Sequence, residues 1–103
     1  MTPMRFNLYA TFRLLAGQKM FVLDLPGGTT VRQAVHALVD HCPVLRPHWL
    51  DGAGEIHAHV HIFVNGQDIN TLDQGEDLVL QPDDALDFFP PVAGGSSEFF
   101  ARH

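Results

Sequence analysis

The 103-residue sequence is poor in cysteine, in lysine and in long apolar runs. Its single cysteine, Cys42, cannot form an internal disulfide or supply a four-cysteine zinc or iron–sulfur site. No apolar run approaches the ~20 residues that a membrane-spanning helix needs, and the first residues lack the charged and apolar regions of a signal peptide. We therefore expect a cytoplasmic protein that does not enter a membrane.

Basic residues are also scarce. Six Lys and Arg residues stand against twelve Asp and Glu residues, which gives a formal net charge of −6, and Lys19 is the only lysine. A groove that follows phosphate groups needs clustered Lys and Arg, so the composition argues against nucleic-acid binding. An acidic surface instead favours partners with basic patches.

The length allows one compact domain and is too short for two. Apolar and polar residues alternate strictly over residues 4–13, which predicts a half-buried strand. A turn at Ala16 and Gly17 leads to a second predicted strand over residues 19–25. Together the two strands read as a hairpin.

A helix is expected next. Thr30, three residues before Gln33, has the spacing of a capping box. Apolar residues then recur at helical spacing for about three turns, until Pro43 ends the pattern. This stripe consists of Val31, Ala34, Val35, Leu38, Val39 and Cys42. Cys42 is therefore expected to be a small core residue, and Trp49 to anchor the following loop over residues 43–56.

Three further strands are predicted in the second half. Alternation resumes over residues 57–64, Asn65-Gly66 is a strong hairpin signal, and residues 67–70 form the short return strand. The last strand covers residues 85–89. His57, His59 and His61 share one face of the first of these strands, and imidazoles suit Zn, Cu or Ni. Alternate strand positions rarely converge on one ion, so we expect solvated histidines and no metal site.

The element order is strand, strand, helix and three strands, which predicts an α+β fold with a mixed sheet. One helix covers one face, and the other face stays open to water. This is the β-grasp, ubiquitin-like arrangement, in which the first and last strands lie side by side. We expect the domain to cover residues 1–92, and residues 93–103 to form a flexible C-terminal arm.

The run Phe-Phe-Pro-Pro-Val-Ala-Gly-Gly, from Phe88 to Gly95, is the most informative stretch. Two prolines hold the backbone extended, and two glycines carry no Cβ. The product is a stiff arm whose end is thin enough to enter a narrow channel. The alternative is that these residues only end the strand.

This run, which follows Asp-Asp-Ala-Leu-Asp, resembles the end of the small subunit of molybdopterin synthase. The resemblance includes Val64-Asn65-Gly66 and the opening strand, and so covers residues 4–95. It is to the MoaD/ThiS class of ubiquitin-like sulfur carriers. It implies that an E1-like enzyme, using ATP and magnesium, adenylates the carboxylate of the last glycine. A persulfide sulfur then displaces AMP and leaves a thiocarboxylate.

The resemblance assigns the reactive carboxyl to Gly95, with Gly94 as its slim neighbour. The chain would be a carrier and not an enzyme, binding no cofactor itself. Its implied partners are an E1-like adenylating enzyme and the molybdopterin synthase large subunit. No Ser–His–Asp arrangement or carboxylate pair suggests an enzyme site of its own.

The sequence departs from the family pattern after Gly95, because residues 96–103 follow. The Gly95 carbonyl is then part of an amide and cannot be adenylated. Either a protease removes residues 96–103, or the chain is not a sulfur carrier. We expect a trimmed carrier for molybdopterin synthesis. The alternatives are a carrier for thiamine, tRNA thiolation or cysteine synthesis, a modifier of protein lysines, and an interaction module with a permanent tail.

A docking surface is expected on the open face of the sheet. Tyr9 and Phe89 point to this face from neighbouring strands, and exposed aromatics surrounded by acids are typical of protein-binding sites. Alternatively, the tail or a loop covers Phe89. The predicted surface consists of Tyr9, Ile69, Phe89, Pro90, Pro91 and Val92, with Asp83, Asp84 and Asp87 as its rim.

Overall fold

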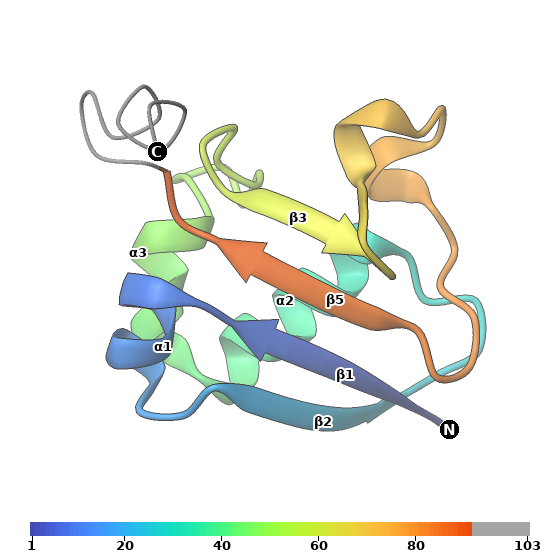
Figure 1. Cartoon of the computed structure of the whole chain (residues 1–103), viewed down its shortest axis with the longest axis horizontal. Helices are drawn as coiled ribbons and strands as arrows, with labels where there is room; N and C mark the ends of the chain where they lie inside the picture. The colour runs from blue at the N-terminus through green and yellow to red at the C-terminus, as the bar shows by residue number, and fades with distance from the viewer. Residues whose placement is uncertain (92–103) are drawn as a thin grey trace, which may run out of the picture.

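The computed structural model describes residues 1–91, which form a five-stranded mixed sheet in the order β2-β1-β5-β3-β4 (Figure 1). The strands are β1 (Thr2–Leu8), β2 (Met20–Leu25), β3 (His61–Val64), β4 (Gln67–Asp68) and β5 (Ala85–Phe89). β1 runs parallel to β5, and the other neighbouring pairs are antiparallel. The first and last strands are central neighbours, which confirms the predicted β-grasp architecture.

Helical segments connect the strands, and the longest of them lies behind the sheet in Figure 1. The α-helices are α1 (Ala10–Ala16), α2 (Val31–His41) and α3 (Arg46–Trp49), and the 3-10 turns are η1 (Pro43–Leu45), η2 (Ile69–Thr71) and η3 (Gly75–Asp77). None of the helices within residues 1–91 has the length and apolar character that a bilayer crossing requires.

Helix α2 begins as predicted. The Thr30 hydroxyl accepts a hydrogen bond from the Gln33 backbone N–H at 3.2 Å, and the Gln33 side chain accepts one from the Thr30 N–H at 2.9 Å. The members of the predicted apolar stripe that lie within the helix are fully buried in the core, namely Val31, Ala34, Val35, Leu38 and Val39. Cys42, just after the helix, is half-buried and packs against the same core. Burial raises the pKa of its thiol, which disfavours the nucleophilic thiolate.

The opening strand is shorter than predicted. β1 ends at Leu8, and residues 10–16 form helix α1 instead of continuing the strand to residue 13. Ala10 has a φ of 52°, which breaks the extended backbone. Phe12 is then buried, and its ring meets that of Trp49 edge to face at 5.4 Å. The alternation in this segment was therefore misleading, because tertiary packing on Trp49 favours a helical turn.

The strand predicted over residues 57–64 is also shorter, since β3 begins at His61. His61 pairs with Phe89, so a longer β3 would have to pair with Pro90 and Pro91. Prolines lack the N–H that a strand partner needs. Residues 57–60 form a turn instead, and the predicted inward residue Ala58 is exposed.

The turn separates the three histidines. The rings of His57 and His59 stack on each other at 4.8 Å, and only His61 lies in the strand. Within residues 1–91, no group of three or more His, Cys, Asp or Glu side chains could hold a metal ion. The alternation had predicted that the three histidines share one strand face. This prediction is wrong, because only His61 lies in the strand.

The loop expected over residues 43–56 contains η1 and α3. Trp49 at its centre is fully buried, which confirms its predicted anchoring role. Its ring stacks on that of Phe88 in β5, with centroids 4.3 Å apart. The loop is thereby fixed to β5, the strand that directly precedes Pro90 and Pro91.

Candidate functional site

The candidate site lies where the parallel strands β1 and β5 end, on the face of the sheet opposite α2 (Figure 1). The backbone N–H of Tyr9 donates to the carbonyl of Phe88 at 3.2 Å, so the pairing continues one residue beyond β1. Parallel strands end at the same edge of a sheet. The segment that leads from β1 into α1 therefore lies beside the end of β5.

Three aromatic rings from three segments meet at this place. The rings of Tyr9 and Phe89 stack with centroids 4.3 Å apart and an interplanar angle of 6°. The ring of Phe63, from β3, meets Phe89 edge to face at 5.4 Å. Tyr9 is 38% exposed, and Phe63 and Phe89 are half-buried. We call Tyr9, Phe63 and Phe89 the aromatic cluster.

The cluster agrees with the predicted pairing of Tyr9 and Phe89 on the open face, with one correction. Tyr9 does not lie in the first strand but follows it, as the residue that precedes α1 in extended backbone. Phe63 was not among the predicted site residues. Its outward position follows from the alternation in β3, but its contact with Phe89 depends on the pairing of β3 with β5, which the sequence does not specify.

Asp87 lies on the open face of the sheet in β5, between the neighbouring strands β1 and β3. In the sheet register it stands opposite Asn7 on one side and Phe63 on the other. The Asn7 Nδ2 donates to Asp87 Oδ1 at 2.8 Å, and the Tyr9 hydroxyl makes a longer contact of 3.5 Å to the same oxygen. Of the three predicted rim acids, Asp87 is therefore the one that the register brings next to the aromatic cluster.

Tyr9 remains a proton donor in this setting. Partial burial, followed by the negative charge of Asp87 and the hydrogen bond to it, raises the pKa of the Tyr9 hydroxyl. The phenol therefore stays neutral at physiological pH. Its hydroxyl is oriented toward the Asp87 carboxylate.

The other two acids of the predicted rim lie elsewhere. Asp84 accepts hydrogen bonds from the Asn65 side chain at 2.8 Å and from the Gln81 backbone N–H at 2.7 Å, so it holds two turns together. Asp83, with a φ of 68°, is exposed at the start of β5, the end opposite Phe89. Neither carboxylate reaches the aromatic cluster.

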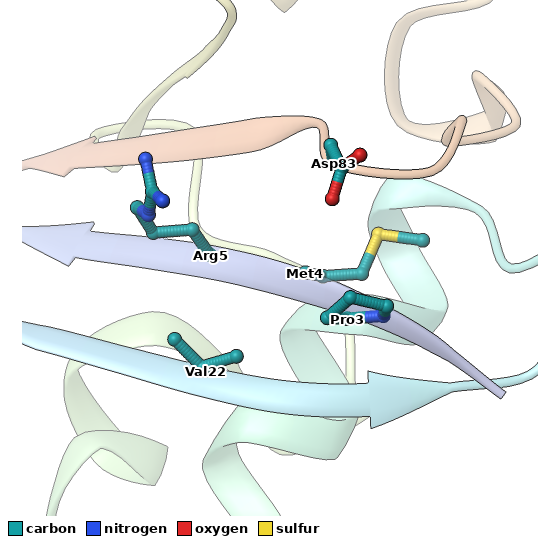
Figure 2. Close-up of a pocket in the computed structure, with 5 residues that line it drawn as sticks. All are labelled: Pro3, Met4, Arg5, Val22 and Asp83. Atoms are coloured by element: carbon teal, nitrogen blue, oxygen red, sulfur yellow. The ribbon is translucent and has the colours of Figure 1, made fainter.

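Asp83 instead lines a shallow hollow of about 280 Å³ at the far end of the sheet (Figure 2). Its lining residues are Pro3, Met4, Arg5, Val22 and Asp83. Figure 2 shows the two charged side chains, Arg5 and Asp83, well apart on the hollow. The lining holds no nucleophile beside a base, so the hollow offers no catalytic arrangement.

The predicted docking residue Ile69 is not on the surface. It is only 4% exposed and belongs to the hydrophobic core. Beyond Asp68 the chain turns into η2, and the Asp68 carboxylate accepts a hydrogen bond from the Asn70 N–H at 2.9 Å. The return strand is thus too short to carry Ile69 to the open face, and this prediction is wrong.

Two prolines follow directly after the aromatic cluster. Pro90 is half-buried and Pro91 is exposed. The remaining predicted site residues, Val92, Gly94 and Gly95, lie outside the described residues, as does the extension over residues 96–103. Their assigned roles stay predictions.

Comparison with known proteins identifies the family. The model of the ThiS family matches residues 6–95, so the match ends at the second glycine. Small archaeal modifier protein 3 of Haloferax volcanii is 33% identical over 92 residues, which cover 89% of this chain and 98% of that protein.

Solved structures agree with the sequence match. The crystal structure of SAMP1 from Haloferax volcanii superimposes with a TM-score of 0.79 and 32% identity, covering 90% of this chain and 99% of that one. The putative molybdopterin converting factor subunit 1 from Pyrococcus furiosus gives a TM-score of 0.71 and 26% identity, covering 89% and 100%. The chain therefore belongs to the ThiS family, with the ubiquitin-like fold of its members.

Proposed function

We propose that this chain is a sulfur carrier for molybdopterin synthesis, whose reactive group is the carboxyl of Gly95 after removal of residues 96–103. The observation that carries the proposal is that the family match ends at Gly95, four residues beyond an exposed proline that follows the aromatic cluster. A solved relative from Pyrococcus furiosus is described as a putative molybdopterin converting factor subunit, which supports this acceptor.

The chemistry requires a free carboxylate and an activating partner. A carboxylate is a poor electrophile until it attacks ATP, releases pyrophosphate and becomes an acyl adenylate. A persulfide sulfur then displaces AMP, and a thiol reduces the acyl disulfide to the thiocarboxylate. ATP and magnesium act in the active site of the E1-like enzyme, and the carrier supplies only its terminal carboxyl.

The role of the domain is to position the Gly95 carboxyl relative to the partner. Phe89 belongs to the aromatic cluster, and Pro90 and Pro91 restrict the backbone that follows. From Pro91 to Gly95 an extended chain spans at most about 14 Å. A partner that covers the aromatic cluster must therefore hold its nucleotide within this reach. Gly94 and Gly95 suit a narrow channel because they have no side chain.

The proposed docking surface consists of the aromatic cluster together with Pro90, Pro91 and Val92. Its partners are the E1-like adenylating enzyme and the molybdopterin synthase large subunit. Both need the same arm, the first to activate Gly95 and the second to receive its sulfur. One surface at the base of the arm serves both encounters in turn.

A second function is favoured by the relatives that are described as small archaeal modifier proteins. In this alternative the same acyl adenylate leads to an amide bond between Gly95 and a lysine of another protein. Cleavage after Gly95 and adenylation are common to both functions. Only the final acceptor differs.

Intact mass spectrometry of the chain from its native host tests the proposal. We expect loss of residues 96–103 and, in a fraction of molecules, a gain of about 16 Da from replacement of one oxygen by sulfur. A chain that retains residues 96–103 under all growth conditions would instead indicate an interaction module with a permanent tail. Conjugates of higher mass, with Gly95 joined to lysine, would identify the modifier.

A further inference from the structure

We infer that Asp87 is the charged anchor of the docking face and that it pairs with an arginine of the E1-like partner, which also stacks on the aromatic cluster. This inference rests on the proposed function, because it concerns the same surface. It adds that Asp87 selects the partner, and that the group it selects on the partner is an arginine side chain.

The position of Asp87 makes it central to any docking on this face. It stands between Asn7 and Phe63 in the register of three adjacent strands, and it is half-buried before any partner arrives. Phe89, two residues further along β5, faces the same side of the sheet. A partner that covers the aromatic cluster therefore covers Asp87 as well.

Only one of the two carboxylate oxygens of Asp87 accepts hydrogen bonds within the described residues. Both of its hydrogen bonds, from Asn7 and from Tyr9, go to Oδ1, and Oδ2 has no hydrogen-bond donor among residues 1–91. The two donors are neutral, so they orient the carboxylate without cancelling its charge. Oδ2 therefore has no partner within residues 1–91, on the face that also carries the aromatic cluster.

No basic residue of the described chain neutralises this charge. Within residues 1–91 the ion pairs join Arg32 to Glu76 and Asp77, and Arg46 to Asp40. Arg5 lies on the same face of β1, but it stands opposite Ala85 in the register and makes no ion pair there. The proposed pairing therefore takes its cation from the partner, since the described residues form no ion pair with Asp87.

Docking without a cation would be costly. Covering the aromatic cluster removes water from Asp87, and an unpaired buried carboxylate loses its hydration without compensation. A partner that brings a cation to this point binds, whereas one that brings an apolar or acidic group is rejected. Asp87 therefore sets specificity more than it adds affinity.

Arginine fits the site better than lysine. A planar guanidinium can donate to Oδ2 while its face lies against an aromatic ring, whereas an ammonium ion offers one point charge. The stacked rings of Tyr9 and Phe89 and the edge-on ring of Phe63 provide such faces beside the carboxylate. The net charge of −6 attracts basic partner surfaces over longer distances as well.

The test uses the trimmed chain, residues 1–95, and the E1-like adenylating enzyme of the same host. Asp87→Asn removes the charge and keeps an oxygen that can accept from Asn7. Asp24→Asn is the matched control, because Asp24 is exposed on β2 opposite Pro3, at the other end of the sheet. Calorimetry should show affinity weakened about tenfold or more by Asp87→Asn and changed less than about twofold by Asp24→Asn.

A double-mutant cycle identifies the partner side chain. Each surface arginine near the nucleotide site of the enzyme is replaced by glutamine and tested against wild type and Asp87→Asn. One such replacement should weaken binding of the wild type and have no further effect on Asp87→Asn. If Asp87→Asn alters self-association of the chain while binding to the enzyme is unchanged, the anchor serves a second copy and the inference is overturned.

Adenylation of the trimmed wild type distinguishes the two levels of failure. If the enzyme adenylates residues 1–95 and Asp87→Asn binds with unchanged affinity, the anchor is wrong while the proposed function stands. If the enzyme does not adenylate the trimmed wild type, the proposed function fails and the inference fails with it.

Discussion

The indole of Trp49 lies flat against the ring of Phe88, with centroids 4.3 Å apart and an interplanar angle of 16°. Phe88 faces the core, and the next residue, Phe89, faces the open side of the sheet. The loop around Trp49 therefore fixes the backbone from which the docking face is built. A core residue and a residue of the proposed docking surface are therefore consecutive in β5.

Trp49→Ala should destabilise the domain by about 3–5 kcal/mol, because it removes a fully buried ring that contacts both Phe88 and Phe12. Urea unfolding followed by circular dichroism measures this loss. Val44→Ala, in the same loop at a side chain that is 45% exposed, is the control and should change the unfolding free energy by less than about 0.5 kcal/mol. Similar losses for the two variants would contradict the anchoring role.

Phe89→Asp should weaken binding to the E1-like enzyme at least about tenfold, because it removes the central ring of the aromatic cluster and adds a charge beside Asp87. Isothermal calorimetry on residues 1–95 provides the measurement. Val22→Asp introduces the same charge on β2, at a side chain that is 55% exposed, and should leave the affinity nearly unchanged. Equal binding by Phe89→Asp and wild type would remove the aromatic cluster from the docking surface.

Gly95→Ala should slow adenylation of the trimmed chain and leave its thermal unfolding unchanged. The added methyl group widens the residue that must enter the partner's channel, while the core described above is built from residues before Pro90. Gly52→Ala is the matched control, since a Cβ at Gly52 would meet nothing within 4 Å. Pyrophosphate exchange at wild-type rate in Gly95→Ala would argue against entry into a narrow channel.

Asp51 should make stability depend on pH on the acid side. Hydrogen bonds from the backbone N–H groups of Glu55 and Ala53, at 3.0 and 2.8 Å, lower the pKa of its carboxyl. A carboxyl whose pKa is lower in the folded state stabilises the fold above its unfolded pKa of about 4, and this contribution disappears as the pH falls through the folded pKa.

Asp51→Asn should therefore be less stable than wild type at pH 7, and the difference should shrink toward zero as the pH falls through the lowered pKa of the folded state. Thermal unfolding over this pH range provides the measurement. Asp73→Asn, at an exposed carboxylate, is the control. A difference between Asp51→Asn and wild type that does not vary with pH would show that the charge of Asp51 is not the stabilising feature.

Helix α2, the Asn65-Gly66 turn between β3 and β4, and the last strand were predictable because their signals are local. The Thr30–Gln33 capping box marks where α2 begins, and the apolar stripe that follows marks the face that it buries. Segment 10–16 was mispredicted because its apolar residues fit two periods. Phe12 continues the alternation of β1, but Phe12, Leu15 and Ala16 also have helical spacing, and packing on Trp49 favours the helix.

The centre of the docking face could not be read from the sequence. Alternation predicts that Asn7, Phe63 and Asp87 point outward, but these residues lie far apart in the chain. Only the register of β1, β5 and β3 brings them into one row. Register depends on pairings between distant segments, so a carboxylate that looked peripheral along the sequence is central in the sheet.

The parallel pairing of β1 with β5 also has a consequence for biosynthesis. β1 is synthesised before the other strands of the sheet, yet its neighbour β5 is not complete until Phe89 has been synthesised. Contacts between segments so distant in the chain form late, because closing the intervening loop costs entropy before any pairing is gained. Until β5 is synthesised, the edge of β1 that pairs with it therefore lacks that partner, and an unpaired strand edge favours aggregation.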